Sequence, residues 1–459
     1  MYKDLRGFIE VLDNHAELIR VHDRLSTKHE ISAVVKYVSR SRNRALLFDN
    51  VEGYRVPVVG NLLGTKRRLA LALGVSEPDV PEKYLSCRQN LIKPALVNNG
   101  PAKQVEILKD VDITRTVPVL THHAKDAGPY FTCAITFARD PDTGIRGMGI
   151  HRIQVKNANT VGLFLASPPL SHFLARAEAK GAPLQIAIVI GIDPITFFSS
   201  VIWAPSGTDK LDIAGALAGR PVEIVKCSTV DLEVPAHAEF VLEGEVIPGE
   251  RQPEGPFGES TGYYFTYQNP VARIKAITHR KDPVYQALVP FTNEESVLLD
   301  FSWEMEHLKE MQKTYPFVRK VHLSNLGLIA IAQIRKGADQ DSRNIIEALL
   351  SNRFSKVVIV VDEDIDPYDY QSVHWALATR VRPERDITIK GDMDGLAIDP
   401  STGAVRVSGD TIFSLAAKTS KVGIDATKPL DDYERYETID VPEGIKPKIR
   451  SIVDRYLSG

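Results

Sequence analysis

Near the start of the chain, apolar side chains recur three and four positions apart, at Leu5, Phe8, Ile9 and Leu12, and the same spacing returns within residues 31–38. This period places the apolar side chains on one face of a helix. Residues 45–63 instead alternate apolar positions with turn-forming residues, which is typical of paired strands. The pattern therefore predicts an α/β region over about the first hundred residues.

From about Val111 the pattern changes to short alternating runs that are separated by tight turns. The clearest runs are residues 130–155, 222–235, 238–250 and 271–289. A period of two residues is typical of strands that bury one face. We therefore expect a β-rich middle domain.

Helical and strand patterns alternate again in the last third of the chain. Helical spacing spans residues 295–311, 342–352 and 370–381, and the apolar runs 326–334 and 356–361 lie between them. Strands that alternate with helices form βαβ units around a parallel sheet. The expected fold class is mixed α/β and β, with a β-rich centre between two α/β ends.

Composition and charge exclude several classes of protein. A chain of 459 residues is longer than a single core usually grows, so two or three domains are expected. The 56 basic residues nearly balance the 59 acidic ones, and the net charge of -3 favours neither nucleic acid nor an anionic membrane as a partner. No apolar run approaches the ~20 residues of a membrane-spanning helix, and no export signal is recognised. Cys87, Cys133 and Cys227 lack CxxC spacing, which favours a reducing cytoplasm over a disulfide framework or a thiolate metal site.

Three motifs resemble functional loops but favour simpler interpretations. DEDIDP, residues 362–367, has the acid spacing of a calcium loop, but Pro367 stands where that loop requires glycine, so we expect a solvated strand end. GIRGMG, residues 144–149, lacks the GK[ST] of a phosphate loop and is predicted to be a turn. His122 and His123 are adjacent on an extended segment, where neighbouring side chains point in opposite directions, so they are not expected to share a metal ion.

Two glutamates stand five residues apart in the segment PEGPFGESTGYYF, residues 253–265. Glu254 and Glu259 would face opposite sides of a straight strand, and on a helix they would lie roughly 140° apart. A bend is needed for them to converge, and the glycines and the proline between them permit one. An ordinary hairpin with exposed acids fits the spacing equally well.

Arg152 lies near the start of an alternating strand in GMGIHRIQVK, among the apolar residues Ile150, Ile153 and Val155. An arginine in that setting is expected to be half-buried and to require carboxylate partners. Its planar guanidinium suits both a glutamate and a substrate carboxylate. A structural ion pair fits the same pattern, so the residues alone leave both roles open.

Taken together, these segments resemble the UbiD family of prenylated-flavin-dependent decarboxylases. The resemblance runs in order along nearly the whole chain, from DLRGFIEVLDNH through GIHRIQVK and EGPFGESTGYY to VVIVVDEDIDPYD and WALATRV. It implies a central split β-barrel, of the flavin-reductase-like kind, between an N-terminal α/β region and a C-terminal α/β dimerisation domain. We place these regions at residues 1–112, 113–305 and 306–459.

By motif position, the resemblance implies that Arg152, Glu254 and Glu259 are catalytic. Arg152 would hold the substrate carboxylate, Glu254 would orient Arg152, and Glu259 would donate a proton to the carbon that loses CO2. The implied cofactor is prenylated FMN. The residues around it correspond to Ile150, His151 and Arg152 and to Phe164, Leu165 and Ala166.

The sequence departs from the family where most relatives hold a divalent metal ion, Mn or Mg, against the flavin phosphate. Gly147, Pro168 and Lys210 occupy these positions, and none can act as the family's asparagine, histidine and glutamate do. We therefore expect no metal, and we expect the Lys210 ammonium to bind the phosphate instead. The alternative metal ligands close by in sequence are His172, Asp209 and Asp212.

The expected function is the reversible, non-oxidative decarboxylation of an aromatic, heteroaromatic or α,β-unsaturated carboxylic acid. The resemblance also implies a flavin prenyltransferase of the UbiX type as cofactor supplier, and a homodimer or larger homo-oligomer. Residues 293–303 are expected to line the substrate pocket, because they follow the last strand of the barrel. One alternative is a non-catalytic UbiD-like subunit of a carboxylase complex, although all three catalytic residues are retained. The other is a flavin oxidoreductase, although nothing in the chain suggests a nicotinamide site.

Overall fold

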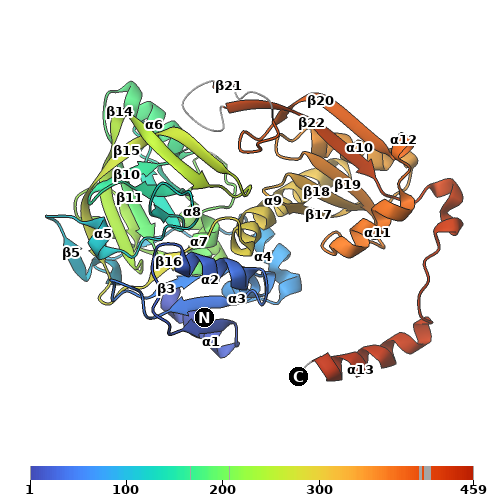
Figure 1. The fold of residues 1–459 in the computed structure, drawn as a ribbon, viewed down its shortest axis with the longest axis horizontal. Helices are drawn as coiled ribbons and strands as arrows, with labels where there is room; N and C mark the ends of the chain where they lie inside the picture. The colour runs from blue at the N-terminus through green and yellow to red at the C-terminus, as the bar shows by residue number, and fades with distance from the viewer. Residues whose placement is uncertain (1, 166, 206, 403–405, 408–414, 458–459) are drawn as a thin grey trace.

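The computed structural model describes residues 2–165, 167–205, 207–402, 406–407 and 415–457. Figure 1 shows two lobes joined by a long helix, α9 (Asn293–Thr314), with the N-terminal and β-rich regions in one lobe and the C-terminal sheet in the other. Within the described part of the chain, no helix is long and apolar enough to cross a membrane.

The N-terminal region forms a small four-stranded sheet. Its elements are α1 (Leu5–Asn14), β1 (Leu18–Val21), α2 (Glu30–Ser39), β2 (Ala45–Phe48), β3 (Val58–Gly60), α3 (Lys66–Leu73) and α4 (Val80–Ser86). The strand order is β1-β2-β3-β16, so β16 (Tyr285–Ala287) completes this sheet from far along the chain. Helix α1 begins after Asp4, whose carboxylate accepts a hydrogen bond from the Gly7 amide at 3.0 Å. All four residues of its predicted apolar stripe are buried.

The central region is a curled nine-stranded sheet with the order β6-β9-β10-β15-β14-β11-β7-β8, and β5 pairs with β15 outside this path. A separate three-stranded sheet has the order β13-β12-β4. The elements are β4 (Ala95–Leu96), β5 (Val105–Ile107), α5 (Ile113–Thr116), β6 (Tyr130–Phe131), β7 (Ala134–Arg139), β8 (Arg146–Ile150), β9 (Ile153–Val155), β10 (Thr160–Leu163), α6 (Leu170–Ala179), β11 (Leu184–Ile190), α7 (Pro194–Ser199), α8 (Lys210–Ala218), β12 (Glu223–Lys226), β13 (Glu233–Pro235), β14 (Phe240–Gly258) and β15 (Tyr264–His279). The predicted β-rich centre is confirmed.

The sheet curls because the chain links its two ends. Strand β8 stands at one end of the strand order and β9 stands next to the other end, yet only His151 and Arg152 separate them in sequence. Backbone hydrogen bonds join this link to strands near both ends of the sheet. The His151 amide donates to Ala134 O in β7 at 3.3 Å, and the Phe164 amide, just after β10, donates to Arg152 O at 3.2 Å. Arg152 therefore sits where the half-barrel closes.

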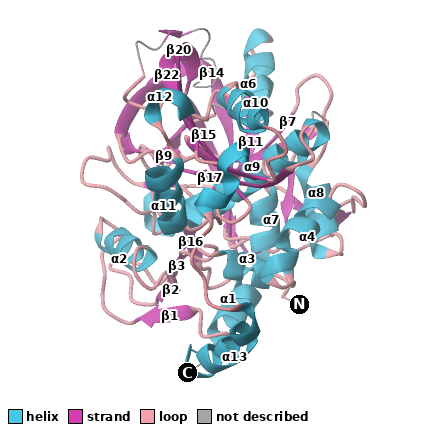
Figure 2. Ribbon diagram, turned by 90° about the vertical axis from the view of Figure 1, so that its right-hand side faces the viewer, coloured by secondary structure: helices cyan, strands magenta, loops and turns pink. Residues whose placement is uncertain are grey.

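The C-terminal region is a six-stranded sheet with the order β17-β18-β19-β22-β20, in which β21 pairs with β22. Its elements after α9 are β17 (Val318–Ser324), β18 (Ile329–Ile334), α10 (Asp339–Leu350), β19 (Val357–Asp362), α11 (Tyr370–Arg380), α12 (Pro383–Asp386), β20 (Ile387–Gly395), β21 (Arg406–Val407), β22 (Leu415–Asp425) and α13 (Lys446–Leu457). Strands β18, β19 and β22 run parallel, as the alternation of helices and strands predicts. Helix α9 packs against β17 and α4, and Figure 1 places it between the lobes. Figure 2 views the molecule from the side of the C-terminal lobe.

One of the loop interpretations is wrong, and another holds only in part. GIRGMG is not a turn, because residues 146–149 belong to β8 and pair with β7, where Gly149 lies opposite Thr136. The solvated strand end expected for DEDIDP agrees with the exposure of Glu363, Asp364 and Asp366. Asp362 is the exception, because it is buried and accepts a hydrogen bond from Arg380 at 3.0 Å. Arg380, from α11, is also buried and binds Asp364 at 2.8 Å, so the acids of this motif compensate a buried cation.

Candidate active site

Arg152 brings the two glutamates of the bend together. Its Nε donates to Glu254 Oε1 at 3.0 Å and its Nη2 donates to Glu254 Oε2 at 2.7 Å, while Nη1 contacts Glu259 Oε1. The exposed fraction is 8% for Arg152, 0% for Glu254 and 7% for Glu259. Burial opposes the charge of Arg152, but Glu259 and Glu254 outweigh it and raise the pKa of the guanidinium. The alternative of a hairpin with exposed acids is therefore excluded.

A bulge in β14 makes the glutamates converge. Glu254 lies opposite Tyr267 in β15 and Phe257 lies opposite Phe265, so two residues of β14 face one of β15. Gly255 has a φ of 104°, and a Cβ atom there would lie 2.5 Å from Phe265 O. Glycine is therefore required at this position. The predicted bend is confirmed, and it reverses the face on which Glu259 would otherwise lie.

Asp126 fixes this bend from outside the hairpin. Its Oδ1 accepts the Gly258 amide at 2.9 Å, and its Oδ2 accepts the His123 amide at 2.7 Å. His122 is buried and lies within hydrogen-bond distance of Ser32 and Thr132. The segment that carries His122 and His123 is therefore joined to the bend through Asp126.

Aromatic rings enclose the guanidinium of Arg152. Its Cζ lies 3.9 Å from the ring centroid of Phe164, 4.8 Å from that of Phe257 and 5.5 Å from that of Tyr267. Rings in these positions attract the cation through their faces and exclude water. The charges of the site therefore interact in an environment of low polarity, where each is worth more than in water.

Two polar residues of β15 were missed by sequence reasoning. Asn269 donates to Glu254 Oε2 at 2.9 Å, and the buried hydroxyl of Tyr267 has no hydrogen-bond partner within the described residues. Burial, followed by the charge of Glu259, raises the pKa of Tyr267. The alternation of Phe265, Tyr267 and Asn269 directly after the bend was the signal that could have identified them, because alternate residues share one face of a strand.

Lys210 is the first residue of helix α8, near the link of His151 and Arg152 between β8 and β9. Asp209 caps that helix by accepting the Leu211 amide at 2.9 Å, and it also binds Arg146 Nε at 2.9 Å. The Lys210 ammonium donates to Ser200 O at 2.7 Å and makes no ion pair with a carboxylate in the described ranges. Burial lowers the pKa of Lys210 to about 8. The site thus holds a cation whose charge is not compensated.

His151 faces this lysine. Burial and then the charge of Lys210 lower the pKa of His151 to about 4, so its ring is neutral at neutral pH. Neither ring nitrogen has a hydrogen-bond partner among the residues that the structure describes. Buried polar atoms are normally satisfied, so an imidazole without a partner near an ammonium that binds only the Ser200 carbonyl indicates a site for a polar ligand.

The other residues expected near the flavin lie around the same link. Ile150 ends β8 opposite Ile135, Phe164 follows β10 and stacks on Arg152, and Leu165 is buried beside it. Ala166 lies outside the described residues. Their contact with a flavin stays a prediction.

The residues at the family's metal positions do not fit a divalent ion. Gly147 has no side chain, and a Cβ atom there would lie 2.6 Å from Phe173 and 2.8 Å from Pro169, so the fold leaves no room for a ligand. Lys210 would repel a cation. Within the described residues, no group of three His, Cys, Asp or Glu side chains is placed to hold a metal.

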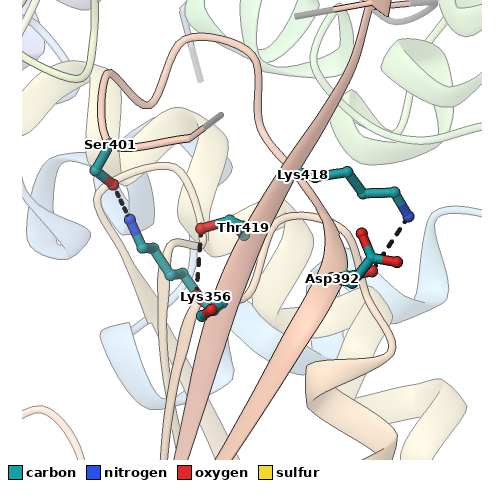
Figure 3. Close-up of a pocket in the computed structure, with 6 residues that line it drawn as sticks. Lys356, Asp392, Ser401, Lys418 and Thr419 are labelled. Atoms are coloured by element: carbon teal, nitrogen blue, oxygen red, sulfur yellow. Dashed lines mark hydrogen bonds between the residues drawn. The ribbon is translucent and has the colours of Figure 1, made fainter. Parts of the chain in front are cut away.

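Two cavities lie away from the Arg152 link. A cavity of about 170 Å³ is lined by Ser260 after the bend, by the first turn of α9 and by the turn between β17 and β18. The expectation that residues 293–303 line the substrate pocket stays a prediction. A larger cavity of about 560 Å³ lies on the C-terminal sheet. Figure 3 shows that both lysines of this cavity already make hydrogen bonds. Lys356 donates to the Ser401 hydroxyl, and Lys418 donates to the backbone carbonyl of Asp392.

Sequence profiles of one enzyme family match most of the chain. The N-terminal, Rift-related and C-terminal domains of 3-octaprenyl-4-hydroxybenzoate carboxy-lyase match residues 9–87, 95–292 and 296–426. These three profiles, all of the UbiD type, occur in the order that the resemblance implies.

Characterised relatives align over nearly their whole length. An anhydromevalonate phosphate decarboxylase of Methanothermobacter thermautotrophicus is 32% identical over 96% of this chain and 100% of its own. A phenolic acid decarboxylase of Sedimentibacter hydroxybenzoicus is 32% identical over 97% of this chain and 96% of its own. The UbiD-class enzyme HmfF of Pelotomaculum thermopropionicum, solved with FMN, has a TM-score of 0.89 at 38% identity, covering 96% of this chain and 97% of that one. Its evolved dimeric form, solved with prFMN, has a TM-score of 0.86 at 36% identity, covering 97% and 98%.

Proposed function

Because the chain belongs to the UbiD family of carboxy-lyases, we propose that it removes CO2 from, or adds it to, an aromatic, heteroaromatic or α,β-unsaturated carboxylic acid with the help of prenylated FMN. The observation that carries the proposal is the arginine shared by two buried glutamates at the closure of the half-barrel. The names of the relatives span an aromatic and a non-aromatic acid, so the proposal stops at the class of substrate.

We assign Arg152 to the substrate carboxylate. Glu254 binds its guanidinium through two hydrogen bonds and is itself fixed by Asn269, so the orientation of Arg152 is set before a substrate arrives. The remaining contact, from Nη1 to Glu259, is made to a single oxygen. A substrate carboxylate would share Arg152 with Glu259, and this contact would bring the acid close to the carbon that loses CO2.

Glu259 is proposed as the proton donor. Loss of CO2 from an sp2 carbon leaves an electron pair that no side chain of this site can delocalise, and the bound prenylated flavin supplies that electron sink. The protein's part is to deliver a proton to the same carbon, and Glu259 lies at the end of the bend, where its carboxyl is buried and directed at Arg152.

Lys210 and His151 fit the flavin phosphate. The ammonium has only a carbonyl partner, and the imidazole has no partner within the described part of the chain, so a phosphate would satisfy both. We propose that this charge replaces the family's metal ion, since Gly147 and Lys210 offer no ligand to a metal.

We propose further that a flavin prenyltransferase supplies the cofactor, that the chain forms a homodimer or larger homo-oligomer, and that it works in the cytoplasm, where its three free cysteines stay reduced. The division at residues 112 and 305 also remains a proposal. It is not a clean one, because β5 pairs with β15 and β16 completes the N-terminal sheet.

Co-expression with a flavin prenyltransferase, followed by anaerobic screening of carboxylic acids for CO2 release, tests the function. We expect a flavin spectrum and CO2 release from at least one unsaturated acid. Flavin binding with nicotinamide oxidation and no CO2 release would favour the oxidoreductase. A colourless protein that stays inactive would favour the non-catalytic subunit.

A further inference from the structure

Glu295, in the first turn of α9, lies beside the proposed proton donor without taking part in the Arg152 cluster. Ser260, the residue after Glu259, donates its hydroxyl to Glu295 Oε1. The Phe291 amide donates to Glu295 Oε2 at 2.8 Å. Burial raises the pKa of Glu295 to about 7, and the charge of Glu259 adds to this effect. The two carboxyls are therefore close enough for their charges to interact, and the Ser260 hydroxyl binds the carboxyl of Glu295.

The carboxyl of Glu295 also lines the 170 Å³ cavity. Phe291 and Arg40, which line the same cavity, are exposed to solvent, so this cavity connects the surface with the neighbour of the proton donor. A space of this volume accommodates several water molecules, each of which needs ≈30 Å³. Glu295 thus stands between water and Glu259.

No cation holds Glu295 in the charged form. Among the described residues it makes no ion pair, in contrast to Glu254 and Glu259, which share Arg152. The charged groups that face it are Glu259 from the turn after β14, Asp300 from its own helix and Arg40 from α2. Both acids favour its protonated form, and Arg40 is exposed, so its charge is screened by solvent.

We infer that Glu295 is the proton reservoir of this site, which restores the proton of Glu259 after each turnover. The inference rests on the proposed function. Glu259 gives its proton to the carbon that loses CO2 and becomes a carboxylate. Glu295 then gives its proton, through the Ser260 hydroxyl or a water in the cavity, to Glu259. Water at the mouth of the cavity protonates Glu295 again, so each CO2 released consumes one proton from solvent.

Because Glu295 acts through Glu259, it is a positioning residue for the proton and not a catalytic one. Asp300 extends the same path away from the site. Its Oδ1 has no hydrogen-bond partner within the described residues, and burial, then Glu304 and Glu295, raise its pKa to about 8. Protonated acids at both positions would let a proton move along α9 without exposing Glu259 to water.

The decisive variant is Glu295→Gln, in the flavin-loaded enzyme with a turned-over acid. A glutamine keeps the oxygen that accepts from Ser260 or Phe291 but has no acidic proton. We expect a burst of one product per flavin, followed by a steady state at least about tenfold slower, because a direct general acid contributes ~10²–10⁴-fold and a resupply step less. Glu295→Asp should restore most of the steady state. Formate should speed Glu295→Ala in proportion to its concentration.

Glu294→Gln is the matched control. Glu294 is the neighbouring buried acid, its pKa is also raised to about 7 by burial, and it accepts the Leu63 amide at 2.9 Å, away from Ser260. It should show no burst and no formate rescue.

An unchanged steady state in Glu295→Gln would overturn the inference, and so would a change in KM without a burst, which would make the cavity a substrate pocket. Equal loss of the burst and the steady state would mean a structural role and would also overturn it. If the flavin-loaded wild type releases CO2 from no acid, the proposed function fails first.

Discussion

Arg152 and Lys210 carry the positive charge of the candidate site in opposite ways. Arg152 is bound by two buried carboxylates and enclosed by three rings, so its charge is compensated by the fold itself. Lys210 has only the carbonyl of Ser200, and burial lowers its pKa to about 8. A buried cation that is paired with carboxylates needs no ligand. A buried cation without such a partner destabilises the folded protein until an anion binds to it.

Only the Arg152 side of the site is preorganised for a ligand. Glu254 and Asn269 fix the guanidinium, so the geometry needed for a substrate carboxylate exists before binding. Within the described residues, the two ring nitrogens of His151 have no partner and the Lys210 ammonium has only the Ser200 carbonyl, so we expect a ligand to complete this side of the site. Chemistry and cofactor retention are therefore expected to respond differently to substitution.

Arg152→Lys should be nearly as damaging as Arg152→Ala. An ammonium cannot bind Glu254 through two parallel hydrogen bonds and also reach a second carboxylate. We expect turnover to be lost in both, and Arg152→Ala to lower the free energy of unfolding by about 3–5 kcal/mol, because it leaves buried carboxylates unpaired. Arg251→Lys, which alters a two-bond pair with Glu178 outside the site, should keep normal turnover. Recovery of most activity with Arg152→Lys would mean that Arg152 acts only through its charge and not through the geometry of its guanidinium.

Lys210→Met should separate cofactor retention from stability. Loss of a charged hydrogen bond worth about 1.5–3 kcal/mol should weaken flavin affinity about 10- to 100-fold. The flavin-free protein should become more stable, because a buried, uncompensated charge is removed. Lys226→Met, at an exposed position in β12, is the control. Unchanged flavin occupancy on gel filtration would contradict a role of Lys210 in flavin binding and leave it as an ordinary residue at the start of α8.

The pH dependence of flavin binding should report Lys210. Its folded pKa of about 8 lies below its ordinary value, so the penalty it places on the flavin-free fold is full below pH 8 and disappears as the pH rises towards the ordinary lysine pKa. Flavin phosphate needs the charged form, so affinity should fall above pH 8, by up to about tenfold per pH unit. Titration of the wild type against Lys210→Met, by fluorescence, measures this. Parallel profiles would contradict the assignment.

Chelation should have the smallest effect. We expect flavin-loaded protein treated with a chelator to keep its flavin and its turnover, because Gly147 and Lys210 cannot ligate a metal. Elemental analysis of the same sample should find no stoichiometric manganese or magnesium. One equivalent of either metal, whose removal stops turnover, would show that other residues hold the ion.

The sequence predicts the elements of this fold well where one period dominates. The C-terminal alternation is confirmed at α9, β18, α10, β19 and α11, because helices with an apolar stripe alternate with the apolar strands β18 and β19, which are buried on both faces. The interpretation of GIRGMG as a turn was wrong because its glycines suggest a turn, whereas in β8 Gly147 is required by the close packing of Phe173 and Pro169. Local composition cannot report a contact made across the fold.

The candidate site was also predicted only in part from the sequence. Arg152, Glu254 and Glu259 were predicted from motifs, yet their convergence depends on a bulge whose register is set by pairing with β15. Asn269, Tyr267 and Glu295 carry no motif of their own. They reach the site because β15 runs beside β14 and because α9 begins where the barrel ends, which are relations between segments and not properties of either one.

The most direct test of the central claim compares Glu259→Gln with the wild type at equal prenylated-flavin content, with CO2 release as the readout. Glutamine keeps the shape and the contact with Arg152 but cannot donate an acidic proton. We predict an unchanged flavin spectrum and turnover reduced by the ~10²–10⁴-fold that a general acid contributes. A variant that keeps more than about a tenth of the wild-type kcat would contradict the account, because removal of a true proton donor should cost ~10²-fold or more.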